Sequence, residues 1–188
     1  MPHRQPHRLL NLRNLLRGSL ALIIAMTLTA CSTLDRGTAP VLERQANWVV
    51  LPFTNHTETP MAGQRAESIA AALLRTSGLN HIKRYPGANK QEALFEASEQ
   101  KLHDDALAWA RQQNARYALV GGVDEWRYKV GVDGEPAVGI TLQIIDVQSG
   151  DNIWSGAGGK SGWSREALSA VAQQLIRDLL KTGLAGAR

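Results

Sequence analysis

The chain offers few side chains that could carry out catalysis or bind a metal ion. Residues 159–161, Gly-Lys-Ser, resemble the end of a phosphate-binding loop, but that motif requires a glycine at the position of Trp154. No two histidines beyond residue 30 stand at a metal-ligand spacing; they are His56, His81 and His103. The sequence therefore predicts a protein that is not an enzyme, with no catalytic residue, metal site or cofactor.

The single cysteine, Cys31, stands in a pattern typical of covalent lipid attachment. With Leu28, Thr29 and Ala30 it resembles the lipobox of bacterial lipoproteins, in which a peptidase cuts before the cysteine and lipids are attached to it. Four arginines and a short apolar run precede it, as in a signal peptide. We predict that residues 1–30 are a signal peptide and that Cys31 is lipidated. The alternative is an ordinary secretory signal followed by a stray free cysteine.

Removal of residues 1–30 changes the charge balance of the chain. These residues hold four of the 21 Lys and Arg and none of the 17 Asp and Glu, so the remainder carries equal numbers of both signs. Binding of nucleic acid through net basic charge is therefore not expected. Ser32, rather than Asp, follows Cys31. In this respect the chain resembles lipoproteins that are sorted to the periplasmic face of the outer membrane.

Hydrophobic periodicity predicts one α+β domain over residues 47–182. The predicted strands are 48–53, 79–85, 117–130, 138–144 and 153–156, and the predicted helices are 60–78, 90–103, 104–114 and 168–179. Asp104 or Asp105 is expected to cap the helix at 104–114, and the order below counts 90–103 and 104–114 as one helical region. The order β-α-β-α-β-β-β-α predicts a mixed β-sheet packed with helices. Residues 31–46 are predicted to be a lipidated tether and residues 183–188 a C-terminal tail.

Trp163 is a candidate for contact with a membrane. It precedes the last predicted helix and has Lys160 and Arg165 nearby. An indole ring among cations suits a membrane interface, where the ring is buried and its N–H stays hydrated. The alternative is that Trp163 fills a gap between the sheet and a helix. Trp154 is a weaker candidate for the same membrane role.

Acidic residues gather on the last three predicted strands and their turns. The first four are Asp124, Glu125, Asp133 and Glu135, and Asp146 and Asp151 follow. In a monomer such residues are usually a solvated surface. In a ring-shaped oligomer, an acidic turn repeated in every subunit would attract cations to the centre.

Three further segments carry a family resemblance. They are residues 48–53, Trp-Val-Val-Leu-Pro-Phe, followed by Asn-His-Thr, then residues 110–122 and residues 146–150. With the lipobox, they resemble the periplasmic lipoproteins that share a fold with the curli secretion factor CsgG, the penicillin-binding-protein activator LpoB and the TolB N-terminal domain. The compact size and the Trp-containing stretch before the last helix most resemble the PelC family of this group.

The resemblance implies a specific role in secretion. PelC-like proteins form a dodecameric ring under the outer membrane, beside the export barrel protein PelB, and guide a cationic exopolysaccharide during biofilm formation. Cys31 would carry the lipid and Trp163 would face the membrane. Asp133 and Glu135, with Asp124 and Glu125, are the candidates for an acidic funnel.

Two other members of this group suggest alternatives. A CsgG-like pore is disfavoured, because the hairpins around residues 131 and 149 are too short and too polar to cross a membrane. An LpoB-like activator of a cell-wall synthase is the main alternative. About fifteen residues separate Cys31 from the first predicted strand, which at roughly 3.5 Å each is too short to reach through the cell wall.

Overall fold

The computed structural model describes residues 32–86, 99–131 and 134–188, which form one unit of seven strands and three helices. The order of the elements is β1 (Ser32–Arg36), β2 (Trp48–Val50), β3 (Thr54–Asn55), α2 (Ala62–Thr76), β4 (Ile82–Arg84), α3 (Glu99–Gln112), β5 (Tyr117–Tyr128), β6 (Pro136–Asp146), β7 (Asn152–Ser161) and α4 (Leu168–Gly183). This is the predicted α+β fold, with the predicted order confirmed and β1 and β3 added.

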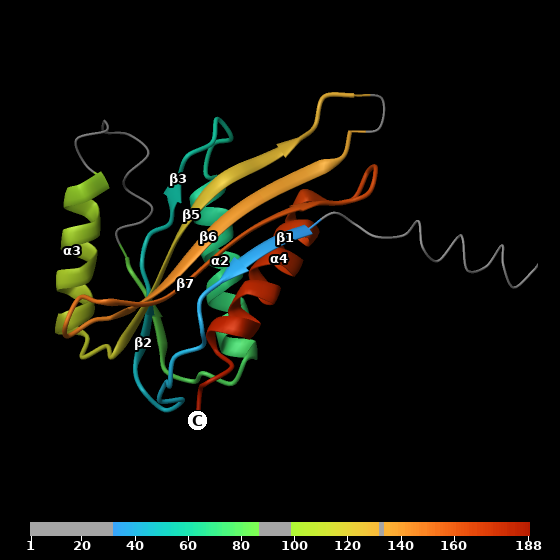
Figure 1. Ribbon diagram of the computed structural model, residues 1–188. Coiled ribbons are helices and arrows are strands. Elements are labelled where there is room, and N and C mark those ends of the chain that lie inside the picture. Colours follow the sequence, from blue (N-terminus) through green and yellow to red (C-terminus); the bar gives the residue numbers. More distant parts are fainter. Residues whose placement is uncertain (1–31, 87–98, 132–133) are drawn as a thin grey trace, which may run out of the picture. The chain divides into compact units, whose positions relative to one another are not determined.

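The strands form one mixed sheet in the order β1-β7-β6-β5-β2-β4, and the short β3 pairs with β5 beyond the end of β2 (Figure 1). Strands β5, β6 and β7 form the predicted antiparallel meander. Strand β2 runs parallel to both of its neighbours, β4 and β5. Parallel neighbours require crossover connections, and α2 and α3 lie in the corresponding stretches of chain.

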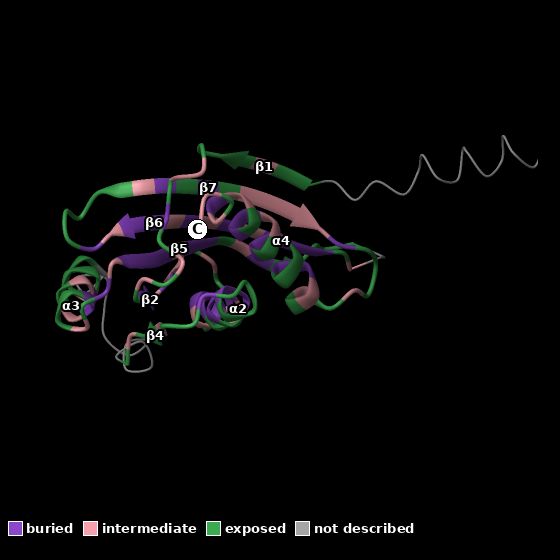
Figure 2. Ribbon diagram, turned by 90° about the horizontal axis from the view of Figure 1, so that it is seen from below, coloured by how far each residue is buried: buried purple, intermediate pink, exposed green. Residues whose placement is uncertain are grey.

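Two hydrophobic clusters cover opposite faces of the sheet (Figure 2). Helices α2 and α4 pack on one face and form the larger cluster, in which Trp48 is buried against Tyr117. The apolar side chains of both helices recur three or four positions apart, as the sequence predicts. Helix α3 contributes Ala106 and Ala110 to the smaller cluster, over β2 and the start of β5.

The segment predicted as a tether, residues 31–46, differs in the structure, because its described part is folded. Strand β1 pairs antiparallel with the edge of β7. Its apolar residue Leu34 packs at Gly158, where a β-carbon would lie 2.6 Å from the leucine side chain. Further along, Leu42 is buried and bridges Ala187, so the predicted tail is also packed. Neither segment has an apolar periodicity that could reveal these contacts.

Two further local expectations differ from the structure, and a third falls mostly outside the described residues. Helix α2 begins at Ala62, two residues later than predicted and without a side-chain cap, and Thr59 before it donates its hydroxyl to the Trp126 carbonyl at 2.6 Å. Asp104 and Asp105 lie inside α3 rather than at its start. Most of the helix predicted over residues 90–103 falls outside the described residues.

Trp154 is buried, so its assignment as a second membrane candidate is wrong. Its indole N–H donates to the Gly37 carbonyl at 3.2 Å. The ring contacts Gly156 and Gly183, where any side chain would collide with it. The two glycines therefore make room for a tryptophan between β7 and α4.

One carboxylate is buried in the fold. Glu67 on α2 has only 1% of its side chain exposed, and its Oε1 accepts two hydrogen bonds from Arg84 of β4, at 2.7 and 3.0 Å. Burial raises the pKa of Glu67 above its usual value of 4.5, although the charge of Arg84 opposes the shift. The pair links α2 to the edge strand of the sheet.

The raised pKa predicts how stability changes with pH. Folded protein keeps the proton on Glu67 to a higher pH than unfolded protein does, so this residue's contribution to stability is greatest below pH 4.5 and falls as pH rises through the folded pKa. The free energy of unfolding of the wild type, minus that of Glu67→Gln, should therefore decrease from acid to neutral pH in urea titrations. Exposed Ser68→Ala should give a flat difference. An increase with pH for Glu67→Gln would contradict the assignment.

Candidate functional site

The residues considered for catalysis lie apart from one another. Within residues 32–86, 99–131 and 134–188, no group of His, Cys, Asp and Glu is placed to hold a metal ion. The histidines His56, His81 and His103 are all exposed. Residues 159–161 belong to strand β7, and an extended strand does not form a phosphate-binding turn. The surface at one end of the sheet is more informative.

Strand β1 places the start of the described chain at a defined point on the sheet. Its register with β7 pairs Ser32 with Lys160, three residues before Trp163. Cys31, the predicted lipidation site, is covalently bonded to Ser32 but lies outside the described residues. The pairing therefore brings the residue after the cysteine to the end of β7 that leads to Trp163.

Trp163 does not fill a gap between the sheet and a helix, because 55% of it is exposed. Its backbone N–H donates to Glu166 Oε2 at 2.9 Å, which holds the turn before α4. Two more exposed apolar residues, Tyr128 and Val130, lie at the end of β5. The Tyr128 hydroxyl donates to the Glu166 carbonyl and accepts from the Leu168 N–H, both at 3.2 Å.

We name this region the anchor-end surface and define it by the apolar residues Tyr128, Val130 and Trp163 with the basic residues Lys129, Lys160 and Arg165. Val130 is fully exposed, and Lys129 Nζ donates to Ser161 Oγ at 2.7 Å, which joins the end of β5 to the end of β7. Sequence reasoning missed Tyr128 and Val130. The sequence signal that could have identified an exposed apolar residue here is Val130, which stands directly before a Gly-rich turn.

No helix among the described residues has the length and apolar character needed to cross a membrane. The anchor-end surface instead combines exposed apolar side chains with cations. Such a combination suits the interface of a bilayer, where apolar side chains enter the headgroup region and cations meet anionic lipids.

The predicted acidic residues gather on the β5–β6 hairpin. Asp124 lies at a bulge in β5 and accepts a hydrogen bond from Thr141 Oγ1 at 3.0 Å. Glu125 pairs with Arg127 at 2.9 Å, and Glu135 lies 3.9 Å from Lys129 Nζ. Asp133 is outside the described residues.

Both ion pairs of the hairpin are exposed, and exposed pairs hold their partners weakly. The acidic side chains can therefore turn toward an external cation. In a single copy, however, Arg127 and Lys129 offset part of the negative charge, so a strong acidic field requires several copies side by side.

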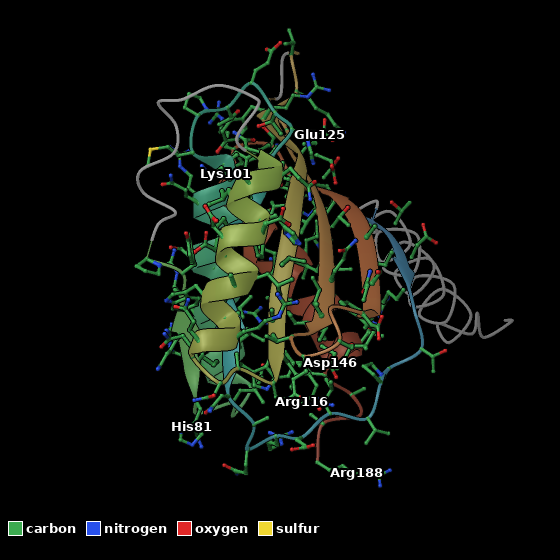
Figure 3. The ribbon with its side chains drawn as sticks, turned by 90° about the vertical axis from the view of Figure 1, so that its left-hand side faces the viewer. His81, Lys101, Arg116, Glu125, Asp146 and Arg188 are labelled. Carbon is green, nitrogen blue, oxygen red and sulfur yellow. The ribbon has the colours of Figure 1, made fainter. Side chains whose placement is uncertain are left out.

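The other two acidic residues of the meander, Asp146 and Asp151, lie at the β6–β7 turn. Asp146 forms an ion pair with Arg116 at 2.8 Å, and its Oδ1 accepts the Gln148 and Ser149 N–H groups in the β6–β7 turn. Figure 3 shows Arg116 and Asp146 close together, at the end of the sheet away from Glu125. Asp151 lies in the same turn. These residues are thus separated from the hairpin acids.

The chain is similar to several solved structures, although no protein-family model and no curated protein matches it. A PelC dodecamer from Paraburkholderia phytofirmans is 44% identical, and the match covers 84% of this chain and 99% of that chain, with a TM-score of 0.70. A variant dodecamer of PelC from the same organism gives 44% identity, 84% and 100% coverage and a TM-score of 0.71. A lipoprotein from Neisseria meningitidis is 18% identical over 72% of this chain and 96% of that chain, with a TM-score of 0.51, and shows the fold alone.

The position of β1 can be tested through Leu34. We expect Leu34→Asp to release β1 from β7, because the aspartate would bring a charge to the site beside Gly158 at a cost of about 1–3 kcal/mol. Hydrogen exchange should then show loss of protection over both strands. Thr33→Ser, on the exposed side of β1, should keep protection. Unchanged protection in Leu34→Asp would exclude this packing.

Proposed function

This chain belongs to the PelC family, and we propose that it acts in Pel exopolysaccharide export as a non-catalytic outer-membrane lipoprotein that forms a periplasmic ring during biofilm formation. The observation that carries the proposal is the 44% identity to a PelC dodecamer over 99% of that chain. Identity at this level over a whole folded unit supports the same assembly as well as the same fold. The proposed partners are other copies of the chain, a PelB-like export barrel protein and a cationic polysaccharide.

The lipid anchor is proposed at Cys31, after removal of residues 1–30. Two or more acyl chains, such as palmitate, hold a protein stably on a membrane, whereas one chain does so only marginally. The absence of Asp after Cys31 supports the outer membrane as the destination. Because β1 begins at Ser32, chain connectivity supports attachment of the lipid close to the anchor-end surface.

Trp163 is proposed to contact the membrane together with the other apolar residues of the anchor-end surface. Its exposure and the cations around it support this role. The lipid would bring this surface to the bilayer, and the apolar side chains would then fix the orientation of the domain. A fixed orientation would direct the ring axis toward the export barrel protein.

The acidic funnel is proposed on the β5–β6 hairpin, with Asp133 and Glu135 as first candidates and Asp124 and Glu125 beside them. Each copy offers only weakly held acidic side chains. Twelve copies would add their fields at the centre of the ring, attract a cationic polymer and repel anions.

The alternative, an LpoB-like activator of a cell-wall synthase, has less support than the sequence alone suggests. Such an activator needs a long tether between its lipid and its folded domain. Here β1 pairs with β7 from Ser32 onward, so the described chain offers even less length than the fifteen residues expected.

The membrane contact predicts a specific fluorescence change. In acylated protein reconstituted with lipids brominated along the acyl chains, Trp163→Phe should abolish most of the quenching seen in the wild type. The reason is that Trp48, Trp126 and Trp154 are buried. As a control, Trp109→Phe on α3 should keep the quenching. Equal quenching in the wild type and in Trp163→Phe would contradict the contact.

The funnel predicts a loss of export when its charge is reversed. We expect the double change Asp133→Lys and Glu135→Lys to lower secretion of the cationic polysaccharide several-fold, because the ring centre would repel it. Native mass spectrometry of the acylated protein should show an assembly of twelve copies in both forms. The matched control is Asp104→Lys with Asp105→Lys on α3. Normal secretion by an assembled, charge-reversed ring would disprove the funnel assignment, and a monomeric wild type would disprove the ring.

A further inference from the structure

One face of the sheet is covered only in part. Helix α3 packs over β2 and the start of β5, and within the described residues no other helix joins it on that side (Figure 2). The register of the meander and β1 places Gly122, Thr141, Ala157 and Asp35 in one row across four strands, and Gly139 and Gly159 in the next row. We name these six residues the open sheet face.

Contacts on the opposite face of the sheet show that the open sheet face points away from α4. Gly156 and Gly158, the neighbours of Ala157 on β7, face α4 and approach Leu179 and Leu175. Because side chains alternate along a strand, Ala157 points away from α4, and it is exposed.

The composition of the open sheet face favours close contact with another protein surface. Glycine weakens a strand and often marks a place where another backbone approaches closely. Three glycines, an alanine and a threonine lie side by side here. His56 lies over the buried Gly122 and Asp124 accepts a hydrogen bond from Thr141, so the part with least side-chain bulk is at Ala157 and Gly159. Asp35 ends the row and has no ion-pair or hydrogen-bond partner for its carboxylate among the described residues.

The opposite side of the unit carries a basic cavity. The C-terminal parts of α2 and α4 enclose a volume of about 380 Å³, with an apolar lining from Leu73, Leu180 and Leu184. Its charged residues are Arg44, Arg177 and Lys181, with no acid among the lining residues. Arg44 donates to the Ser77 carbonyl at 3.0 Å. Arg177 and Lys181 have no partner within the part of the chain that the structure describes.

We propose that the open sheet face of one copy docks on the α2–α4 surface of the next copy, with Asp35 facing Arg177 and Lys181. This assignment rests on the proposed ring. A head-to-tail ring needs two different, complementary patches on every subunit. With twelve copies each step turns by about 30°, so the two patches must lie on nearly opposite sides of the subunit.

The fold meets both requirements. The open sheet face and the α2–α4 surface lie on opposite sides of the sheet, since both helices pack on the face that Ala157 turns away from. The charges also match: Asp35 on one side and Arg177 and Lys181 on the other have no ion-pair partner among the described residues. The lining leucines of the cavity, Leu73, Leu180 and Leu184, are buried or half-buried, so the cavity offers a hollow with an apolar floor and a basic rim.

Cysteine cross-linking tests the contact in the full acylated chain. Cys31 is the only native cysteine, and its thiol is proposed to carry lipid, so engineered cysteines would be the only free thiols. After oxidation, the double variant Ala157→Cys with Lys181→Cys should give a denaturing-gel ladder that extends to twelve copies. Each single variant should stay monomeric on the gel. The control pair, Ala108→Cys on α3 with Lys181→Cys, should give no ladder.

The outcomes separate the two proposals. If the native mass shows an assembly of the wild type but the double variant gives no ladder, the contact is overturned and the ring stands. Dimers of Ala157→Cys alone would show a sheet-to-sheet contact and also overturn it. A monomeric wild type would overturn the ring and, with it, the contact.

Charge exchange gives a second test of the same contact. Asp35→Arg should lower the assembled fraction at least tenfold, and adding Arg177→Asp and Lys181→Asp to the same chain should restore it. Failure of the combined variant to reassemble, while Asp35→Asn assembles normally, would contradict the proposed pairing.

Discussion

The structure depends on the hydrogen-bonded ladder of β5. Among the described strands, β5 pairs with β2 and β3 on one side and with β6 on the other, so it joins the parallel part of the sheet to the antiparallel meander. Gly121 of this strand lies so close to the Phe53 ring and to the Thr141 carbonyl that a β-carbon would come within 2.8 Å of both. The packing of the β2–β3 segment on the central strand therefore requires glycine there.

The length of the meander strands connects this ladder to function. Strand β5 has twelve residues and β6 has eleven, whereas β2 has three. The long strands β5 and β6 continue well beyond the end of β2 (Figure 1). Tyr128 and Glu125 lie on this extended part of β5, because β2 pairs only with residues 117–119 of that strand. The same extension provides the part of β7 on which β1 pairs. A single structural feature thus presents both the acidic hairpin and the apolar residues of the anchor-end surface.

The ion pair at buried Glu67 and the exposed ion pairs of the β5–β6 hairpin have different roles. The ion pair between buried Glu67 and the more exposed Arg84 belongs to the fold, because the Glu67 carboxylate is shielded from water and holds β4 to α2. The hairpin pairs are exposed and contribute little to stability. Their value would come from repetition around a ring, where weak fields from separate copies add at the centre.

The sequence by itself determined the features that depend on neighbouring residues. Alternation along residues 138–144 predicted β6, helical spacing predicted α2 and α4, and the residues around Cys31 predicted lipid attachment, which no contact in the described unit tests. Only the tertiary structure decided the role of residues whose partners are distant in the chain. Leu34 becomes part of a strand because Gly158 leaves space for it, and Trp154 is buried because Gly156 and Gly183 do the same. Trp163 lacks such partners and stays exposed. Local composition sets the conformation that a segment prefers, whereas burial depends on the space left by residues that the fold brings together from elsewhere.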